Sequence, residues 1–122
     1  MLTDTDKIAA ARRWVEAWNR RDLDAILEHY ADDVEFHAST VVARWGRPDG
    51  TLRGKDELRE HFSRGLALVP DLRFALEDIL LSPDGYAVIY RRENGNRVID
   101  AVELDAGGHA ARVHAYYATR QA

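Results

Sequence analysis

The sequence of 122 residues contains no cysteine, which excludes disulfide bonds, thiolate catalysis and cysteine-ligated metals and leaves the redox compartment open. It also has no apolar run of about 18 residues, the length that a transmembrane helix needs. Residues 1–14 lack the apolar stretch of a secretory signal. We therefore expect no membrane partner and a cytoplasmic location.

An excess of basic charge is missing as well. The chain carries 17 Lys and Arg against 21 Asp and Glu, and both signs occur along its whole length. A nucleic-acid partner would need a basic face, so we expect none. The spacing of His29, His61, His109 and His114 matches no metal site. We predict that the protein uses neither a metal nor another cofactor.

What is present is the composition of a globular protein, with 46% hydrophobic and 31% charged residues. The length suits one hydrophobic core, so residues 1–122 are predicted to form a single domain. Three segments have the apolar spacing of amphipathic helices. They span about 5–21, a short stretch capped by Asp22, and about 56–69, where Pro70 ends the helix.

Strand patterns occupy the rest of the chain. Between Val34 and Ala38 the apolar period changes to two, which predicts a half-buried strand. Glycine and proline make 39–53 a long irregular loop, whose apolar residues suggest a lid. Beyond the third helix, turn sequences such as Asn94-Gly95 separate four further strands. These strands are predicted at 72–81, 86–93, 96–104 and 110–118.

The order α-α-β-α-β-β-β-β predicts an α+β domain in which three helices cover the concave face of a curved antiparallel sheet. Three helices cover such a sheet only in part, so an apolar pocket is expected between the two layers.

Asp100 is the candidate for chemistry. Residues 98, 100, 102 and 104 share one face of a predicted strand, and Asp100 is the one acid among three aliphatic residues. A carboxyl group in an apolar site has a raised pKa unless a cation holds its charge. Two interpretations follow: Asp100 is a protonated hydrogen-bond donor or acid/base group, or Arg91, Arg97 or another arginine pairs with it and it does no chemistry.

Two segments resemble bacterial ketosteroid isomerases of the nuclear transport factor 2-like, or SnoaL-like, superfamily. They are YADDVEFHA, residues 30–38, and VIDAVELDAGGHAARVHAYY, residues 98–117. The resemblance implies a cone-shaped, cystatin-like fold and places Asp100 on the family's oxyanion-hole aspartic acid. It also places Trp14 where the family has a tyrosine and Ala38 where it has the general base. Ketosteroid isomerisation itself is therefore not expected.

The resulting hypothesis is a protein that binds a small apolar molecule with a carbonyl or hydroxyl group, as a cofactor-independent isomerase or cyclase in which Asp100 polarises the oxygen. His37, beside Ala38, is an alternative base, although strand alternation points it outward. The predicted substrate-binding residues are Trp14, Trp18, Phe36, Ala38, Phe62, Phe74, Tyr90, Val98, Val102, Val113 and Tyr117.

Two alternatives stay open. The first is water activation of the epoxide-hydrolase type, with Asp100, an arginine and a second acid such as Asp78. The second is a ligand-binding or dimerising module without catalysis. By analogy with relatives, the outward face of the last strand, with Arg112, His114 and Tyr116, is expected to form a homodimer.

Overall fold

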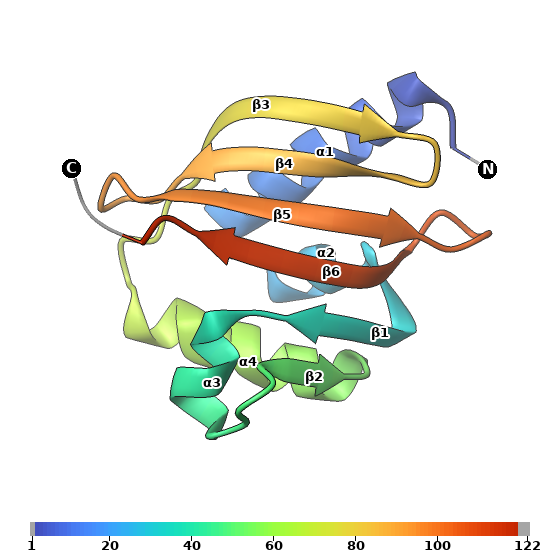
Figure 1. Ribbon diagram of the computed structural model, residues 1–122. Coiled ribbons are helices and arrows are strands. Elements are labelled where there is room, and N and C mark those ends of the chain that lie inside the picture. Colours follow the sequence, from blue (N-terminus) through green and yellow to red (C-terminus); the bar gives the residue numbers. More distant parts are fainter. Residues whose placement is uncertain (1, 120–122) are drawn as a thin grey trace.

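The two N-terminal helices begin at side-chain caps in the computed structural model, which describes residues 2–119 (Figure 1). Helix α1, Asp4–Asn19, starts with a capping box, in which Thr3 accepts the Asp6 N–H and the Asp6 carboxylate accepts the Thr3 N–H. Helix α2, Leu23–Leu27, starts where the Asp22 carboxylate accepts the Ala25 N–H. The expected helical pair is confirmed, with the first helix starting slightly earlier than predicted.

The segment 39–53 differs from the prediction. Strand β1, Tyr30–His37, is followed by helix α3, Ser39–Trp45, and by the short strand β2, Thr51–Arg53. The prediction of one irregular loop was wrong because its glycine and proline residues gather in the turn between α3 and β2. Gly46 ends α3 in the left-handed conformation that glycine favours, with a φ of 67°. Val41 is fully buried, so α3 is packed against the core.

The remaining elements follow the predicted order. Helix α4, Lys55–Leu68, precedes four strands joined by turns. The strands are β3 (Ala75–Ser82), β4 (Gly85–Arg91), β5 (Arg97–Leu104) and β6 (Ala110–Tyr117). Residues 2–119 thus contain four helices, one more than predicted.

The strands form one sheet in the order β2-β1-β6-β5-β4-β3. All neighbours are antiparallel except β1 and β6, which run parallel. The predicted sheet was antiparallel throughout, and this pair corrects it. The last strand of the C-terminal meander returns beside the first strand in the same direction, so the α+β class holds with a mixed sheet.

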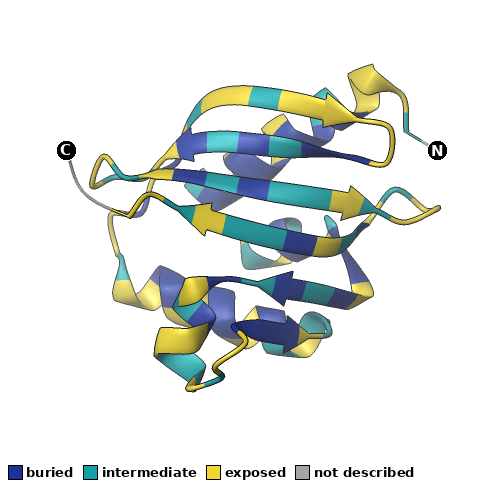
Figure 2. Cartoon of the chain, in the orientation of Figure 1, coloured by how far each residue is buried: buried dark blue, intermediate teal, exposed yellow. Residues whose placement is uncertain are grey.

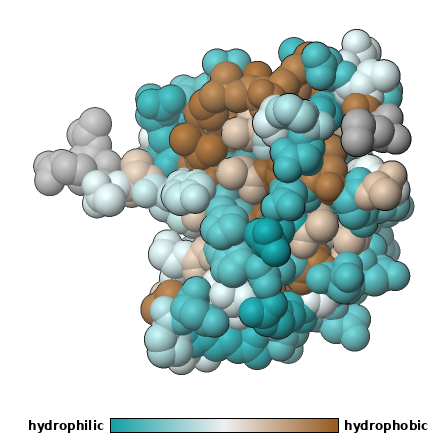
Figure 3. All heavy atoms as spheres, turned by 45° about the vertical axis from the view of Figure 1, so that its right-hand side comes forward, coloured by the Kyte–Doolittle hydropathy of each residue, from teal (hydrophilic) through white to brown (hydrophobic). Residues whose placement is uncertain are grey.

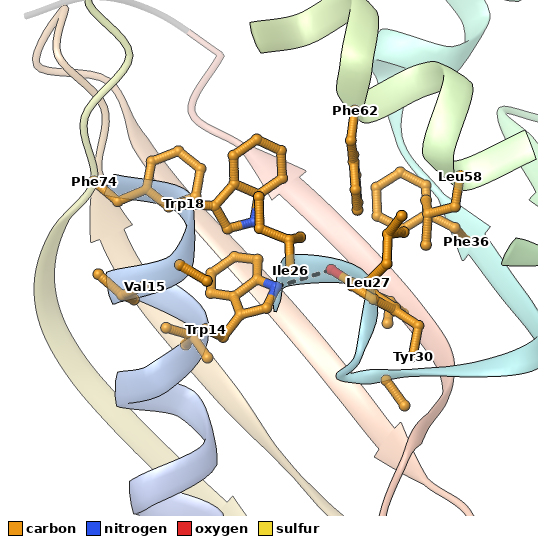
Figure 4. Packing of buried hydrophobic residues seen from close by; sticks show 14 of the residues in the cluster. Trp14, Val15, Trp18, Ile26, Leu27, Tyr30, Phe36, Leu58, Phe62 and Phe74 are labelled. Atoms are coloured by element: carbon orange, nitrogen blue, oxygen red, sulfur yellow. Dashed lines mark hydrogen bonds between the residues drawn. The ribbon is translucent and has the colours of Figure 1, made fainter. Parts of the chain in front are cut away.

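The core lies between the helices and one face of this sheet (Figures 1 and 2). Buried positions alternate with half-buried ones along β4 and the second half of β1, as expected when one face is covered more fully than the other. Aromatic residues fill the centre of this layer (Figure 4), and Trp14, Trp18 and Phe74 contact one another there. Within residues 2–119, every helix is too short or too polar to cross a membrane.

Candidate functional site

Asp100 lies in the middle of β5, opposite Val88 of β4 and Ala115 of β6. Its neighbours on the same face, Val98 and Val102, also point toward the helices, as the alternation predicts. Only 4% of the Asp100 surface is exposed. The carboxyl group is therefore inside the core layer.

The partner of this carboxyl group is a hydroxyl group and not a cation. Tyr90, on β4, donates its O–H to Oδ1 of Asp100 at 3.0 Å. Arg91 and Arg97 both pair instead with Glu77 on the other face of the sheet. Among residues 2–119, no arginine or lysine forms an ion pair with Asp100. The interpretation that an arginine holds its charge was therefore wrong.

Burial raises the pKa of Asp100 from 3.8 to about 7, and the hydrogen bond from Tyr90 opposes this effect. The expectation of a raised pKa is confirmed. Below pH 7 the carboxyl group is mostly protonated, so its O–H is able to donate a hydrogen bond to a neutral oxygen.

Tyrosines surround Asp100 in the core. The pKa values of Tyr30, Tyr86 and Tyr117 are all raised, first by burial and then by the charge of Asp100. Trp14, which the resemblance places at the oxyanion tyrosine, donates its indole N–H to the Tyr30 hydroxyl at 2.9 Å (Figure 4). Tyr30 is the first residue of β1 and lines a small cavity together with Asp100, a place that was not predicted from the sequence.

A cavity opens from Asp100 toward α3 and α4. It encloses about 540 Å³ of space between atoms, open mouth included, of which about 60 Å³ admits the centre of a water-sized sphere. The latter volume holds roughly four to six waters. The cavity is lined by Trp14, Trp18, Phe36, Thr40, Arg44, His61, Phe62, Gly65, Leu72, Phe74, Tyr90, Arg92, Asp100, Ala115 and Tyr117.

Seven of the eleven predicted substrate-binding residues line this cavity together with Asp100. Val102 lines a smaller neighbouring cavity on the other side of Asp100. Val98, Val113 and Ala38 are buried but line neither space. Trp18 adds an unexpected feature, because its buried indole nitrogen has no hydrogen-bond partner within residues 2–119.

His37 does not lie with Asp100. Its ring contacts Glu35 and Thr51 through hydrogen bonds of 2.9 Å and stacks on His114 with centroids 4.3 Å apart. These residues occupy the outer face of the sheet, so the suggestion that His37 replaces the missing base in this cavity is not supported. Ala38 is the N-cap residue of α3 and offers only a methyl group.

His61 is the histidine that does line the cavity. The Trp45 indole N–H donates to its Nδ1 at 3.1 Å, so the ring hydrogen is on Nε2, which lies 3.2 Å from the Thr40 hydroxyl. Burial, followed by the charges of Arg44 and Arg64, lowers the pKa of His61 to about 4. His61 is therefore neutral near pH 7. Its place on the apolar stripe of α4, next to Phe62, could have revealed it.

The epoxide-hydrolase alternative requires a second acid in the cavity. Asp100 is the only acid in the cavity wall formed by the described residues. Asp78 is exposed on β3, where its carboxylate accepts the N–H of Ile79. The Asp/Arg/Asp set is therefore not assembled.

A family model described as the SnoaL-like domain matches residues 11–120. The chain belongs to the SnoaL-like family. The fold expectation is thereby confirmed, while the finer resemblance to ketosteroid isomerases stays a prediction. No functionally curated protein matches this SnoaL-like chain.

Solved structures resemble the SnoaL-like protein over nearly its whole length. A SnoaL-like protein of unknown function from Burkholderia thailandensis is 33% identical, with a TM-score of 0.91 and coverage of 97% of this chain and 99% of its own. TerC, crystallised with polyporic acid, is 20% identical with a TM-score of 0.75 and coverage of 93% and 92%.

A Mycobacterium tuberculosis protein in complex with estradiol-17β-hemisuccinate is also 20% identical, with a TM-score of 0.72 and coverage of 93% and 94%. At this identity, the likeness to it and to TerC shows a shared fold.

Proposed function

We propose that this SnoaL-like protein binds a small, mostly apolar molecule with its carbonyl or hydroxyl oxygen against Asp100 and Tyr90. The observation that carries the proposal is a carboxyl group that is buried, uncompensated by a cation and placed in the wall of an aromatic cavity. A protonated carboxyl group costs far less to bury than an ionised one, and its O–H is able to donate a hydrogen bond to a polarised oxygen.

The aromatic walls support a planar ligand. The aromatic residues Trp14, Trp18, Phe36, Phe62 and Phe74 all line the cavity. Such rings provide large apolar contact areas and favour stacked or edge-on packing with a ligand ring. Two structures of the same fold were obtained with polyporic acid and with estradiol-17β-hemisuccinate, which supports small-molecule binding as the shared role.

The chemistry of the walls favours binding over turnover. Isomerisation or cyclisation needs a base beside the polarised carbonyl group, and a positioned base contributes about 10²–10⁴-fold. His61 is occupied at Nδ1 and carries its hydrogen on Nε2, and Ala38 has no titratable group. We therefore expect little isomerisation of a β,γ-unsaturated ketosteroid, measured as the absorbance of the conjugated product.

Ligand binding is tested by indole fluorescence, since Trp14 and Trp18 line the cavity. We expect aryl ketones such as 4-hydroxyacetophenone to change the emission at pH 6, and Asp100→Leu to abolish this change while the protein stays folded. Asp78→Asn, at an exposed acid, is the matched control. Unchanged binding by Asp100→Leu would refute the role of Asp100.

We also propose that the outer face of the sheet forms a homodimer. Leu80, Ala87, Ala101 and His114 lie in one row across four strands, and Tyr116 beside them is 58% exposed. Figure 3 shows hydrophobic side chains gathered over the upper part of the molecule, where β3 and β4 lie. Exposed apolar patches of this kind mark interaction sites.

The charges at the borders of this face suit a second copy. Glu77 with Arg91 and Arg97 borders one end, and Glu35 with Arg53 and Arg112 borders the other. These ion pairs already compensate much of the charge, so two copies meet through the apolar middle without strong repulsion. Light scattering should give twice the chain mass, and Ala101→Arg should reduce it to the monomer. A monomeric wild type would refute the proposal.

A further inference from the structure

Two arginines, Arg44 and Arg92, line the cavity, and they differ in their partners. Arg92 donates to the carboxylate of Glu93 through Nε at 3.0 Å and through Nη2 at 3.2 Å. Arg44 makes no hydrogen bond or ion pair with any residue in the range 2–119. One uncompensated positive charge therefore belongs to the cavity wall.

The fold holds this charge in place. Arg44 is in the last turn of α3, and its guanidinium group lies against Gly65 of α4, where a side chain Cβ would be 3.2 Å from Nη1. Because Gly65 has no side chain, the guanidinium group lies close to the helix backbone at the cavity wall. The neighbouring His61 is neutral near pH 7, because burial and then the charge of Arg44 lower its pKa to about 4.

No acid in the described cavity wall balances Arg44. Asp100 is the one acid there, and it is mostly protonated below pH 7 because burial raises its pKa. A guanidinium group that is partly removed from water and lacks an anion is costly, and a carboxylate matches its planar donor pattern in two parallel hydrogen bonds. The cavity thus has one neutral hydrogen-bonding group and one cationic group.

We propose that the ligand is an anion, an aromatic or similarly planar carboxylate whose charged group pairs with Arg44 while a carbonyl or hydroxyl oxygen meets Asp100 and Tyr90. This inference rests on the proposed function and names its ligand class. The space that admits the centre of a water-sized sphere, about 60 Å³, suits a ligand with one ring. Larger ring systems require movement of the aromatic walls or of α3.

The test compares two probes of nearly the same shape, the anion 4-acetylbenzoate and the neutral 4-acetylbenzamide. Both carry a ketone for Asp100, and only the first carries a carboxylate for Arg44. Their dissociation constants are measured by indole fluorescence and by calorimetry at pH 6, where His61 is neutral and Asp100 is mostly protonated. We expect the wild type to bind the acid about tenfold more tightly than the amide, as for one charged hydrogen-bonded pair.

Three variants locate the preference. Arg44→Met should remove the roughly tenfold preference by weakening binding of the acid much more than binding of the amide, and Arg44→Lys should keep part of the preference. Arg20→Met, which removes an exposed arginine paired with Asp22, should change neither constant. Because Arg44 has no partner in the described chain, its variants should unfold at nearly the wild-type temperature.

The outcomes separate the two proposals. Equal binding of acid and amide by the wild type, or an acid preference that survives Arg44→Met, overturns the anion site and leaves the proposed function standing. Absence of binding by both probes at millimolar concentration, confirmed by calorimetry, overturns the proposed function and this inference with it.

Discussion

The two faces of the sheet shift the pKa values of their acidic residues in opposite directions. On the inner face Asp100 is buried, accepts one hydrogen bond from Tyr90 and has its pKa raised to about 7. On the outer face Glu35 is bound by His37, Arg53 and Arg112, which lower its pKa to about 2. The outer acid therefore stays charged through the physiological range, whereas the inner one changes charge within it.

This difference shows that the alternation of side chains along a strand decides the protonation behaviour of an acidic residue as well as its burial. Along β5, Asp100 points inward and Glu103, three positions later, points outward to Arg112. The outer acids contribute to ion pairs in water, which add little to stability. The inner acid reduces stability when it ionises, and acids with such raised pKa values cluster at functional sites.

The largest effect is expected for Asp100→Asn. A pKa of about 7 against the ordinary 3.8 corresponds to roughly 4 kcal/mol. Because the folded pKa is raised, the stability contribution of protonated Asp100 is fully present below pH 4 and is lost as the pH rises to 7. The difference in unfolding free energy between wild type and variant should therefore change by about 4 kcal/mol between pH 4 and 8.

The two proteins are compared by urea unfolding across this range. The difference between wild type and variant is the right quantity because the lowered pKa values of His29 and His61, both about 4, act in both proteins with the opposite slope. Parallel stability curves for the two proteins would show that Asp100 does not titrate in the core.

Tyr90→Phe should have the next largest effect. It removes the hydrogen bond that stabilises ionised Asp100, so the pKa of Asp100 should rise further. The variant should lose about 2 kcal/mol of stability at pH 8, where Asp100 is charged, and less at pH 5. Carboxyl-carbon NMR gives the pKa, and Tyr116→Phe at an exposed hydroxyl is the control. An unchanged or lowered pKa would contradict the assigned contact.

A smaller effect is expected at Gly65, beside the inner-face cation. Gly65→Ala should gain up to about 1 kcal/mol of helix stability in α4. The added methyl group lies 3.2 Å from Nη1 of Arg44, so the guanidinium group must shift and affinity for 4-acetylbenzoate should fall. Ser63→Ala, exposed on the same helix, should leave affinity unchanged. Tighter binding of the acid would contradict the placement of Arg44.

Glu35→Gln should have the smallest effect on stability, although the pKa of Glu35 is far from its ordinary value. Its hydrogen bond with His37 and its pairs with Arg53 and Arg112 are near solvent. Because the folded pKa is lowered, its contribution is complete above pH 4.5 and is lost as the pH falls to 2. Urea unfolding between pH 5 and 8 should show parallel curves, and a clear slope would contradict the assignment.

Periodicity made the inner face readable from the sequence. The alternation of β5 and β6 placed Asp100 in the core, and the stripe of α1 placed Trp14 and Trp18 over it. The alternation also placed His37 outward, where the structure has it. These positions follow from the local apolar pattern and from the burial of one face of the sheet, and both can be read from the sequence.

The positions of the remaining site residues depend on the register between strands and on the segment 39–53, whose structure was predicted wrongly. Tyr90 contacts Asp100 because β4 and β5 pair Tyr90 with Val98, a register set by the whole hairpin. Thr40 and Arg44 were missed because α3 was taken for a loop. Its glycine and proline signal was assigned to 39–53 as a whole, although it belongs to the turn after Gly46.

The parallel pairing of β1 with β6 affects the order in which the chain folds. It joins Glu35 to Arg112, 77 positions apart, and β1 has no other sheet neighbour except the three-residue β2. β1 and β2 can therefore join the rest of the sheet only after β6 has been synthesised. Such pairing between segments distant in the sequence slows folding.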